Sequence, residues 1–315
     1  MDNPSKYSAS KLSVTDRLIP CVLAAGLAMG STTANAATLV VAYAGSMGRL
    51  MDHYIGPRFA AANHEQYQGI GRGAFGLARM LKSGQLHADV FLAITRGPVR
   101  ILQRAKLVQQ AQAFAATQMV MAWSRRSSRT KQFAVSKADH APWYKVLETP
   151  GIRFGRTDPL TDPQGRASLL CLQLAAKYYH QPPLATRITG PVENPAQIFT
   201  EASLMFRLRA GQIDACLTYQ SAARAAHVPY VVLPPEINLG DPQFQSQYAA
   251  ARLVVRSGRG KRLRFRGHPL IFYCVTLKNS HHPRLSAAFM RYLHSPTVRP
   301  WMRACGYTPV MMTVR

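Results

Sequence analysis

Residues 38–47 read TLVVAYAGSM. The run through residue 44 is short and almost wholly apolar, which is typical of a strand buried inside a sheet. Gly45 and Ser46 end this run, and a helical pattern follows from about 47 to 62. A buried strand that turns directly into a helix predicts an α/β fold with mostly parallel strands.

The same alternation of strand and helix continues along the chain. Further strands are expected at residues 88–94, 117–123, 153–155, 213–219, 230–233, 252–255 and 270–277. Helices are expected at about 75–82, 99–105, 143–148, 167–179, 198–210, 221–226, 286–294 and 296–305. Residues 69–76 are rich in glycine and predict a turn, and residues 256–269 predict a basic loop.

The chain of 315 residues carries a large positive charge. Lys and Arg number 39 against 14 Asp and Glu, which gives a formal net charge of +25. A hydrophobic fraction of 47% with only 17% charged residues excludes a disordered, highly charged chain. The positive excess implies an anionic partner, and composition leaves nucleic acid, an acidic membrane surface and small oxyanions open.

Residues 1–36 have the pattern of a secretory signal peptide. Lys6, Lys11 and Arg17 precede an apolar run at 18–29, and small residues follow up to the sequence ANA at 34–36. The apolar run is too short for a permanent membrane anchor. We therefore expect cleavage after the last of these alanines and an exported protein.

Four cysteines remain beyond this cleavage point: Cys171, Cys216, Cys274 and Cys305. They are widely spaced and form no C-x-x-C motif, so they predict neither a zinc site nor a redox motif. Three of them lie in apolar runs, which favours buried free thiols. Export permits disulfides, and the sequence leaves that alternative open.

The turn at Ser46 is the first candidate binding element. A helix start presents free backbone N–H groups and the positive end of the helix dipole, and a serine there adds a hydroxyl donor. Such a turn suits an oxyanion. The alternative is an ordinary N-cap, which is the usual role of serine at a helix start.

The second candidate element is the glycine-rich segment 71–76, which reads GRGAFG and matches G-x-G-x-x-G. A dinucleotide site would need a preceding strand and an acid near the end of the next strand, but Asp89 comes at that strand's start. We therefore expect no dinucleotide. The N–H groups near Gly73 and Ala74 could still serve a smaller anion.

Two further candidates lie in the second half of the chain. Asp162 precedes the long helix at 167–179, where it either caps the helix or points into a cleft. Thr218 and Tyr219 end an expected strand, and ligands of open α/β sheets lie at the carboxyl ends of strands. The alternative for Tyr219 is a strand-end hydroxyl in contact with water.

The sequence gives little support for nucleic-acid binding, catalysis or metal binding. The basic runs at 125–131 and 252–266 contain few aromatic residues for stacking on bases, so we favour solvated loops over a nucleic-acid site. There is no G-x-S-x-G or H-E-x-x-H motif, and His281 and His282 are adjacent rather than at helical spacing. We therefore expect no enzyme, no cofactor and no resident metal.

Several of these segments occur together in an order that resembles a known family. They read YAGSM at 43–47, GAFGLAR at 73–79, ADV at 88–90, DPQGR at 162–166, GQIDA at 211–215, YQS at 219–221, LPPEINL at 233–239 and HSPTV at 294–298. The chain is similar to the tungstate/molybdate-binding proteins of ABC importers, a branch of the periplasmic solute-binding proteins. The resemblance covers nearly all of the chain beyond the signal peptide.

The resemblance implies the type II periplasmic-binding-protein architecture, with two α/β lobes that close on a ligand cleft at the hinge. Residues 37–121 and 231–315 would form lobe one, and residues 122–230 would form lobe two. The implied function is capture of a tetrahedral oxyanion, molybdate or tungstate, by a periplasmic monomer that delivers it to an ABC permease. Nucleic acid is not an expected partner.

The resemblance also implies a ligand set. Ser46 and the backbone at Gly73 and Ala74 would donate from lobe one, although a second serine is usual at the position of Ala74. Asp162, Thr218 and Tyr219 would complete the site from lobe two.

Asp162 matches a carboxylate that contacts the metal of the bound anion. The second such carboxylate is usual at the position of Thr218. The departure leaves the coordination geometry open, and it leaves phosphate or sulfate as alternative ligands. A cleft enzyme and a nucleic-acid-associated basic protein are the rival classes.

Overall fold

The computed structural model describes residues 36–138, 142–258 and 260–310. The expected signal peptide lies outside these residues except for its last position. Residues 36–315 form one compact unit. Within the described part of the chain, no helix combines the length and apolar character needed to cross a membrane.

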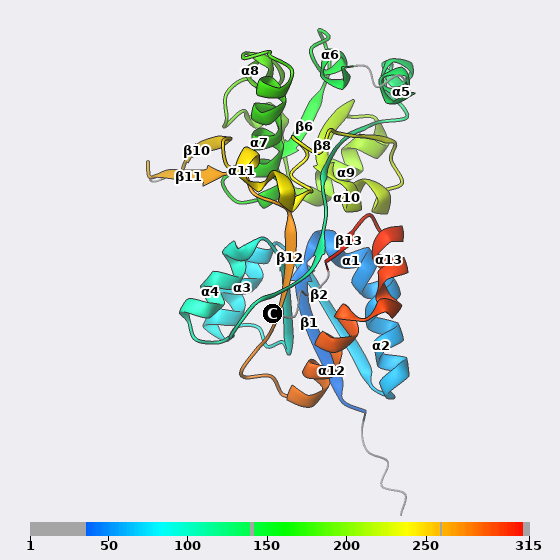
Figure 1. Cartoon of the computed structure of the whole chain (residues 1–315), viewed down its shortest axis with the longest axis vertical. Helices are drawn as coiled ribbons and strands as arrows, with labels where there is room; N and C mark the ends of the chain where they lie inside the picture. The colour runs from blue at the N-terminus through cyan, green and yellow to red at the C-terminus, as the bar shows by residue number, and fades with distance from the viewer. Residues whose placement is uncertain (1–35, 139–141, 259, 311–315) are drawn as a thin grey trace, which may run out of the picture. The chain divides into compact units, whose positions relative to one another are not determined.

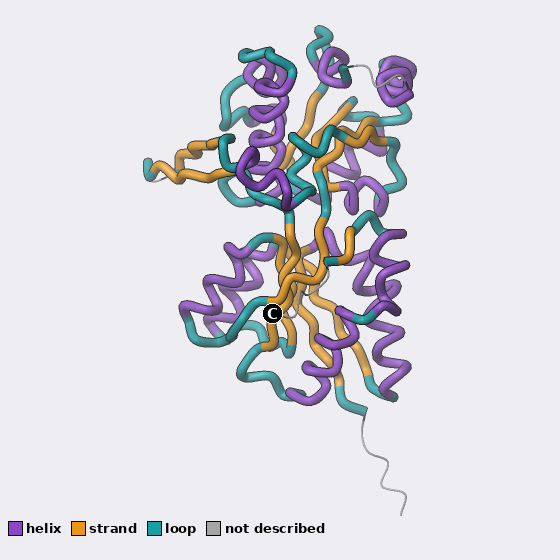
Figure 2. The backbone as a smooth tube through the Cα atoms, viewed as in Figure 1, coloured by secondary structure: helices purple, strands orange, loops and turns teal. Residues whose placement is uncertain are grey.

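The first sheet has six strands in the order β13-β4-β12-β3-β1-β2. Its strands are β1 (Thr38–Ala44), β2 (Gln66–Arg72), β3 (Val90–Ile94), β4 (Gln112–Ala116), β12 (Ile271–Thr276) and β13 (Thr308–Pro309). Strand β1 runs parallel to both its neighbours, whereas β12 is antiparallel to β3 and β4. Helices lie on both sides of these strands (Figures 1 and 2).

The helices of this half follow the strands along the chain. A continuous helical stretch starts at Gly45 and includes α1 (Gly48–Leu50) and α2 (Gly56–Asn63). The others are α3 (Ala74–Ser83), α4 (Arg96–Arg104), α12 (Pro283–His294) and α13 (Arg299–Ala304).

The second sheet has five strands in the order β7-β6-β8-β5-β9. Its strands are β5 (Met119–Trp123), β6 (Phe154–Thr157), β7 (Ile198–Phe199), β8 (Ala215–Tyr219) and β9 (Tyr230–Val232). The accompanying helices are α5 (Thr130–Ala138), α6 (Trp143–Leu147), α7 (Pro163–Tyr178), α8 (Leu184–Thr189), α9 (Glu201–Ala210), α10 (Gln220–Ala225) and α11 (Gln245–Tyr248). Strand β8 is parallel to β6 and antiparallel to β5. The α/β class predicted from the sequence is thus confirmed.

The chain crosses between the two sheets next to Thr117 and again near Leu270. The amide of Thr117 donates to the Leu270 carbonyl (3.0 Å), and the Leu270 amide donates to the Leu239 carbonyl (2.8 Å). The expected lobe boundaries at 121/122 and 230/231 both fall inside strands of the second sheet, within β5 and β9. The LPPEINL segment therefore lies at the crossover, where the Asn238 carbonyl accepts from the Met119 amide (2.7 Å).

Two expectations for local structure were wrong. The first half of the turn expected at 69–76 belongs to strand β2, because Gly71 gives room to the Tyr43 ring: a Cβ at Gly71 would lie 2.7 Å from a ring carbon. The basic loop expected at 256–269 contains a strand. Arg252–Arg256 (β10) and Arg262–Arg266 (β11) form an antiparallel hairpin separate from both sheets.

The core is apolar and includes the cysteines. Cys171, Cys216, Cys274 and Cys305 are buried free thiols, and burial raises the pKa of each. Close packing fixes helix α7 on the second sheet, since a Cβ at Gly165 would lie 2.3 Å from the carbonyl oxygen of Thr157.

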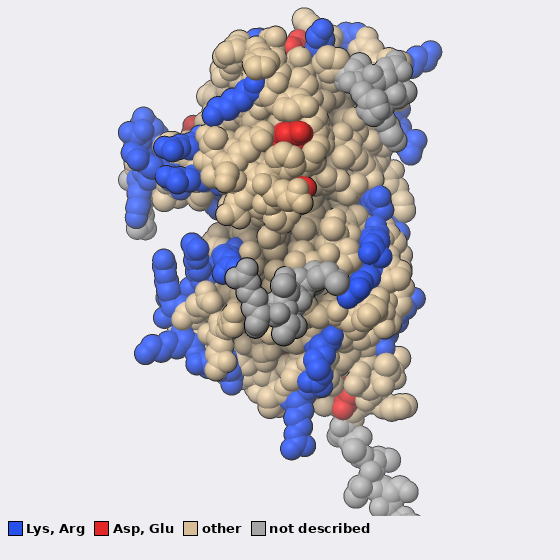
Figure 3. All heavy atoms as spheres, in the orientation of Figure 1, with Lys and Arg blue, Asp and Glu red and all other residues tan. Residues whose placement is uncertain are grey.

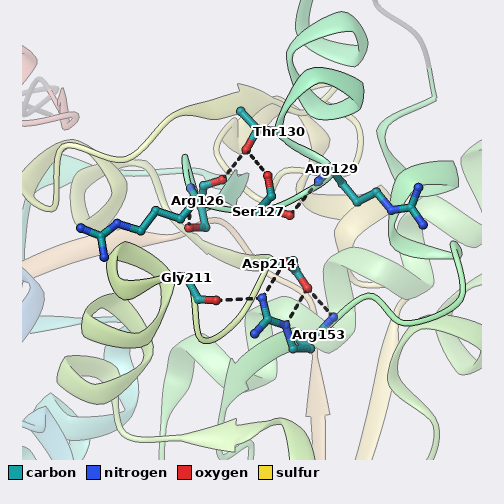
Figure 4. A network of polar contacts seen from close by, with 8 residues as sticks. Arg126, Ser127, Arg129, Thr130, Arg153, Gly211 and Asp214 are labelled. Carbon is teal, nitrogen blue, oxygen red and sulfur yellow. Dashed lines mark hydrogen bonds and ion pairs between the residues drawn. The ribbon is translucent and has the colours of Figure 1, made fainter.

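The GQIDA segment at 211–215 has a structural role in the second sheet. Asp214, in the GQIDA segment, accepts hydrogen bonds from the backbone amide and the guanidinium of Arg153 at 2.9 to 3.0 Å (Figure 4). The same guanidinium donates to the Gly211 carbonyl at 2.7 Å. Asp214 therefore joins the start of β8 to the segment before β6 and is not available to a ligand.

Candidate functional site

A cleft of about 990 Å³ lies where helix starts of both sheets meet. Residues 44–46 and 71–77, which follow β1 and β2, line it from the first sheet. Asp158, residues 161–163, residues 198–202 and Tyr219 line it from the second sheet. The carboxyl ends of strands thus surround the cleft, as is general for ligand sites in open α/β sheets.

Ser46 lies at the start of the helical stretch that follows β1. It is half-buried and lines the cleft. Its carbonyl accepts a hydrogen bond from the Tyr307 hydroxyl (2.8 Å), which fixes the turn to the segment before β13. The turn therefore holds the Ser46 side chain and the first helical N–H groups in a fixed position at the cleft wall.

Gly73 and Ala74 begin helix α3 beside Ser46. Gly73 is the N-cap and is exposed, and among the described residues no side chain caps the first helical turn. The first N–H groups of a helix have no partner within the helix. Both residues line the cleft, so these donors are available to an anion there.

Asp162 lines the cleft from the start of α7. One of its carboxylate oxygens, Oδ1, accepts from the Gln164 amide at 2.8 Å, so the capping role weighed from the sequence is present. Burial raises the pKa of Asp162, although the Gln164 hydrogen bond opposes the rise. Asp162 therefore both caps α7 and lines the cleft.

Thr218 and Tyr219 separate at the end of β8, because successive strand residues face opposite sides. Tyr219 lines the cleft, and its buried hydroxyl has no hydrogen-bond partner among the described residues. Thr218 is fully buried and donates to Gln164 Oε1 at 3.2 Å. The structure brings Ser46, Gly73, Ala74, Asp162 and Tyr219 together at the cleft and leaves Thr218 outside it.

Glu201 is a cleft residue that the sequence analysis missed. It is the first residue of α9, after the N-cap Thr200, where a carboxylate is stabilised by the helix dipole. A Cβ at Gly45 would lie 3.9 Å from Glu201 Oε2, so this carboxyl group reaches the turn after β1. The T-E pair was a usable signal, but the helix was expected to start earlier, at 198.

The electrostatic environment sets Glu201 apart from an ordinary surface carboxylate. Burial raises the pKa of Glu201 to about 8, and the negative charge of Asp162 adds to the rise. Burial, together with these two carboxylates, also holds the pKa of the Tyr219 hydroxyl well above its usual range. At neutral pH Glu201 is therefore mainly protonated, and both it and Tyr219 can donate hydrogen bonds.

Positive side chains line the cleft on the side of the first sheet. Arg49, Arg72 and Arg79 are all lining residues. Arg49 also reaches the second half of the chain, where its Nη1 lies 2.7 Å from His227 Nε2. Helix N–H groups and arginines on one side, with hydroxyl and carboxyl groups on the other, form a site that can bind an anion through charge-assisted hydrogen bonds.

Among the described residues, no three His, Cys, Asp or Glu side chains are grouped so that they could hold a metal ion. The arrangement of groups at the cleft can bind and orient a solute through donors from both sides.

Comparison with known proteins identifies the class. A model of the bacterial extracellular solute-binding protein family matches residues 39–308, and the chain belongs to this family. The family is defined by binding of solutes outside the cell rather than by a reaction.

Three relatives illustrate the range of similarity. An uncharacterized solute-binding protein of Petrotoga mobilis is 30% identical over 167 residues, which are 52% of this chain and 51% of that protein. A putative ABC transporter molybdenum-binding protein of Haloferax volcanii is 28% identical over 76% of this chain and 78% of its own. The molybdate/tungstate-binding protein WtpA of Thermococcus kodakarensis is 26% identical over 199 residues, which are 57% of this chain and 54% of that protein. The matched segment thus spans about half the length of some relatives.

Solved structures share the fold at low sequence identity. The sulfate-binding protein SubI of Mycobacterium tuberculosis has a TM-score of 0.59 at 15% identity, with 88% of each chain covered. The periplasmic molybdate-binding protein of Azotobacter vinelandii has a TM-score of 0.59 at 14% identity, covering 86% of this chain and 98% of its own. These proteins have the type II periplasmic-binding-protein architecture, so the predicted fold class is confirmed.

Proposed function

We propose that the protein captures an oxyanion in this cleft, with molybdate or tungstate as the first candidates, and delivers it to an ABC permease. Family membership supports solute binding. The names of the Haloferax and Thermococcus relatives support molybdate or tungstate as the ligand. The proposed location is the periplasm, the proposed form is a monomer, and the bound anion undergoes no reaction.

The observation that carries the proposal is the pairing of two helix starts with two carboxyl groups across one cleft. Ser46, Gly73 and Ala74 supply donors from the first sheet. Asp162 and Glu201 face them from the second sheet. Oxyanion oxygens need hydrogen-bond donors, whereas a hard metal centre within the anion accepts an ionised carboxylate oxygen, here that of Asp162, as an additional ligand.

Glu201 changes the ligand set expected from the resemblance. The second carboxylate that the family usually carries at the position of Thr218 is absent, and Glu201 lies in the same cleft as Asp162. Asp162 would contact the metal of the anion. Glu201, protonated at neutral pH, would donate to an oxyanion oxygen, as would Tyr219.

Ligand capture would close the two lobes about the crossover near Thr117 and Leu270. Arg49 already contacts the second half of the chain at His227. The Arg166 guanidinium of α7 lies 5.4 Å from the ring centroid of Phe75 in the first half. These contacts can form or break without disturbing either sheet, which is the requirement for a hinge motion.

A second candidate ligand is an organic anion. The cleft volume of about 990 Å³ is large for an inorganic oxyanion. Phe75, Met80, Phe199 and Met205 add apolar area to its wall. An organic molecule with a carboxylate or phosphate group would use the same donors and fill the remaining space.

A thermal-shift series tests the proposal. The protein is heated with molybdate, tungstate, sulfate, phosphate or a small phosphorylated organic acid, at constant ionic strength. A ligand that binds only the folded state raises the midpoint by mass action. A selective rise with molybdate or tungstate supports the first candidate. A rise only with the organic acid supports the second, and no shift with any anion contradicts both.

A further inference from the structure

The hairpin of β10 and β11 presents an arginine-rich face. Residues paired directly across an antiparallel hairpin point to the same side, and alternate pairs share that side. The pairs Arg252–Arg266, Val254–Arg264 and Arg256–Arg262 therefore lie on one face. All six side chains of these pairs are exposed. We call these five arginines and Val254 the arginine face.

The opposite side of the hairpin is apolar and packed. Leu253 and Val255 are buried, and Phe265 lies under the Arg166 guanidinium at 4.1 Å from its ring centroid. In the described part of the chain, β10 and β11 form a two-stranded sheet of their own. The hairpin projects beside α7, and blue side chains gather on it in the space-filling view (Figures 1 and 3).

The arginine face is electrostatically unfavourable within the protein itself. Like charges directly opposite each other on paired strands destabilise the pairing, and Arg252–Arg266 and Arg256–Arg262 are two such pairs. Throughout residues 36–138, 142–258 and 260–310, ion pairs within 4.0 Å join only Arg153 to Asp214 and Arg187 to Glu148. The charge of the arginine face is therefore left for an external partner.

We propose that the arginine face docks on the surface of an anionic phospholipid membrane. The guanidinium group matches phosphate geometry with its fork of donors and is more weakly hydrated than an ammonium group. A row of guanidiniums about a central valine suits the boundary between headgroups and acyl chains. Docking would hold the protein near a membrane and does not depend on which solute the cleft binds.

Nucleic acid is the less favoured polyanion for two reasons. The family acts outside the cell. The arginine face also lacks an aromatic side chain on which a base could stack, because Phe265 is on the packed side of the hairpin.

Vesicle sedimentation tests the proposal with residues 36–315, which form their own compact unit. Vesicles of phosphatidylcholine are compared with vesicles that also contain phosphatidylglycerol. In the test variant all five arginines of the face become glutamine. Because each arginine near an anionic surface adds appreciable attraction, we expect at least about tenfold weaker binding to the anionic vesicles. Added salt should weaken binding of the unmodified protein as well.

A matched variant controls for net charge. It replaces five exposed basic residues elsewhere with glutamine: Arg100, Arg104, Arg125, Arg126 and Lys145. We expect this variant to keep vesicle affinity within about twofold. An equal loss in both variants overturns the proposal, because binding would then follow net charge alone.

Two other results also overturn it. One is the absence of any preference of the unmodified protein for anionic over neutral vesicles. The other is stronger binding to a DNA duplex than to vesicles at the same salt concentration, which would make nucleic acid, and not a membrane, the partner of the arginine face. The anion thermal shift of the hairpin variant should be unchanged, which separates a failure of this proposal from a failure of the proposed function.

Discussion

The hydroxyl of Thr218 donates to Gln164 Oε1 at 3.2 Å, between strand β8 and helix α7. Both residues are fully buried. Thr218, where the sequence resemblance implies a departure from a carboxylate, is thus a neutral side chain that connects a strand to a helix. The cleft receives its second carboxyl group from Glu201 on another helix.

Thr218→Val removes this hydrogen bond while keeping the shape of the side chain. Gln164 Oε1 then loses a partner in a buried place, and we expect the free energy of unfolding to fall by about 1 kcal/mol. Anion affinity should stay within about twofold because Thr218 does not line the cleft. Urea unfolding and titration calorimetry on the same variant check both expectations. A large loss of affinity at unchanged stability would contradict the placement of Thr218.

Tyr219→Phe should have the opposite effects, with unchanged stability and weaker anion binding. The buried hydroxyl has no partner among the described residues, so its removal should leave the free energy of unfolding unchanged or slightly higher. If the hydroxyl donates to the bound anion, the dissociation constant should rise by about tenfold, the usual scale for a hydrogen bond to a charged group. Calorimetry with the best anion of the thermal-shift series measures this. Unchanged affinity would remove Tyr219 from the ligand set.

The raised pKa of Glu201 predicts how the free energy of unfolding depends on pH. Its pKa of about 8 in the folded protein lies above the ordinary value of 4.5. Between these two values the folded state holds a proton that the unfolded state has released, so the free energy of unfolding falls as pH rises through this window. Thermal midpoints from pH 5 to 9 should therefore decline less in Glu201→Gln than in the unmodified protein.

Glu201 should also make anion binding depend on pH. Above about pH 8 the ionised carboxylate repels an anion that its protonated form attracts, so affinity should fall. Glutamine keeps a donor without ionising, and Glu201→Gln should lose this fall. The exposed Glu193, changed to glutamine, is the control and should behave as the unmodified protein does. The same pH profile in all three proteins would exclude Glu201 from the site.

The elements that the sequence predicted well are those whose pattern is local. The run TLVVAYA formed β1, and the helical pattern after Ser46 formed a helix, because apolar runs and helix-start residues act within a few positions. Strand β2 was missed because its glycines resemble a turn. Glycine is needed there because the Tyr43 ring on the neighbouring strand lies close to Gly69 and Gly71. This contact joins residues far apart in sequence, so no local pattern reveals it.

The candidate site was predictable to a similar extent. Ser46, Gly73 and Asp162 stand at helix starts, so their place at the carboxyl end of a sheet follows from the strand–helix order. The sequence could not show which of Thr218 and Tyr219 faces the cleft, because that depends on which side of the sheet each residue of β8 faces. Glu201 needed the contact between α9 and the turn at Gly45, which lies 156 positions away by the numbering and has no sequence pattern.

A substitution at Gly165 tests how closely α7 packs on the second sheet, and the same substitution at Gly76 in α3 is the control. A Cβ at Gly165 would lie 2.3 Å from the Thr157 carbonyl oxygen, whereas a Cβ at Gly76 in α3 meets nothing within 4 Å. Gly165→Ala should therefore lower the free energy of unfolding by about 1–3 kcal/mol through overpacking. Gly76→Ala should raise it by about 0.5–1 kcal/mol through helix propensity. Equal effects in urea unfolding would contradict the close contact of α7.

Asp162 has two roles, as N-cap of α7 and as a proposed ligand, and two substitutions separate them. Asparagine is as good an N-cap as aspartate, so Asp162→Asn should keep the free energy of unfolding, while Asp162→Ala should lose about 1 kcal/mol. Both should weaken molybdate or tungstate at least about tenfold if the carboxylate binds the metal of the anion.

The direction of the Asp162→Asn effect also distinguishes the ligands. For an anion that only accepts hydrogen bonds, removal of a nearby negative charge should strengthen binding rather than weaken it. Calorimetry of Asp162→Asn with molybdate and with sulfate compares the two cases in one protein. Weaker molybdate and unchanged or stronger sulfate would support a carboxylate–metal contact, whereas stronger binding of both would show that Asp162 acts only as a cap and a repulsive charge.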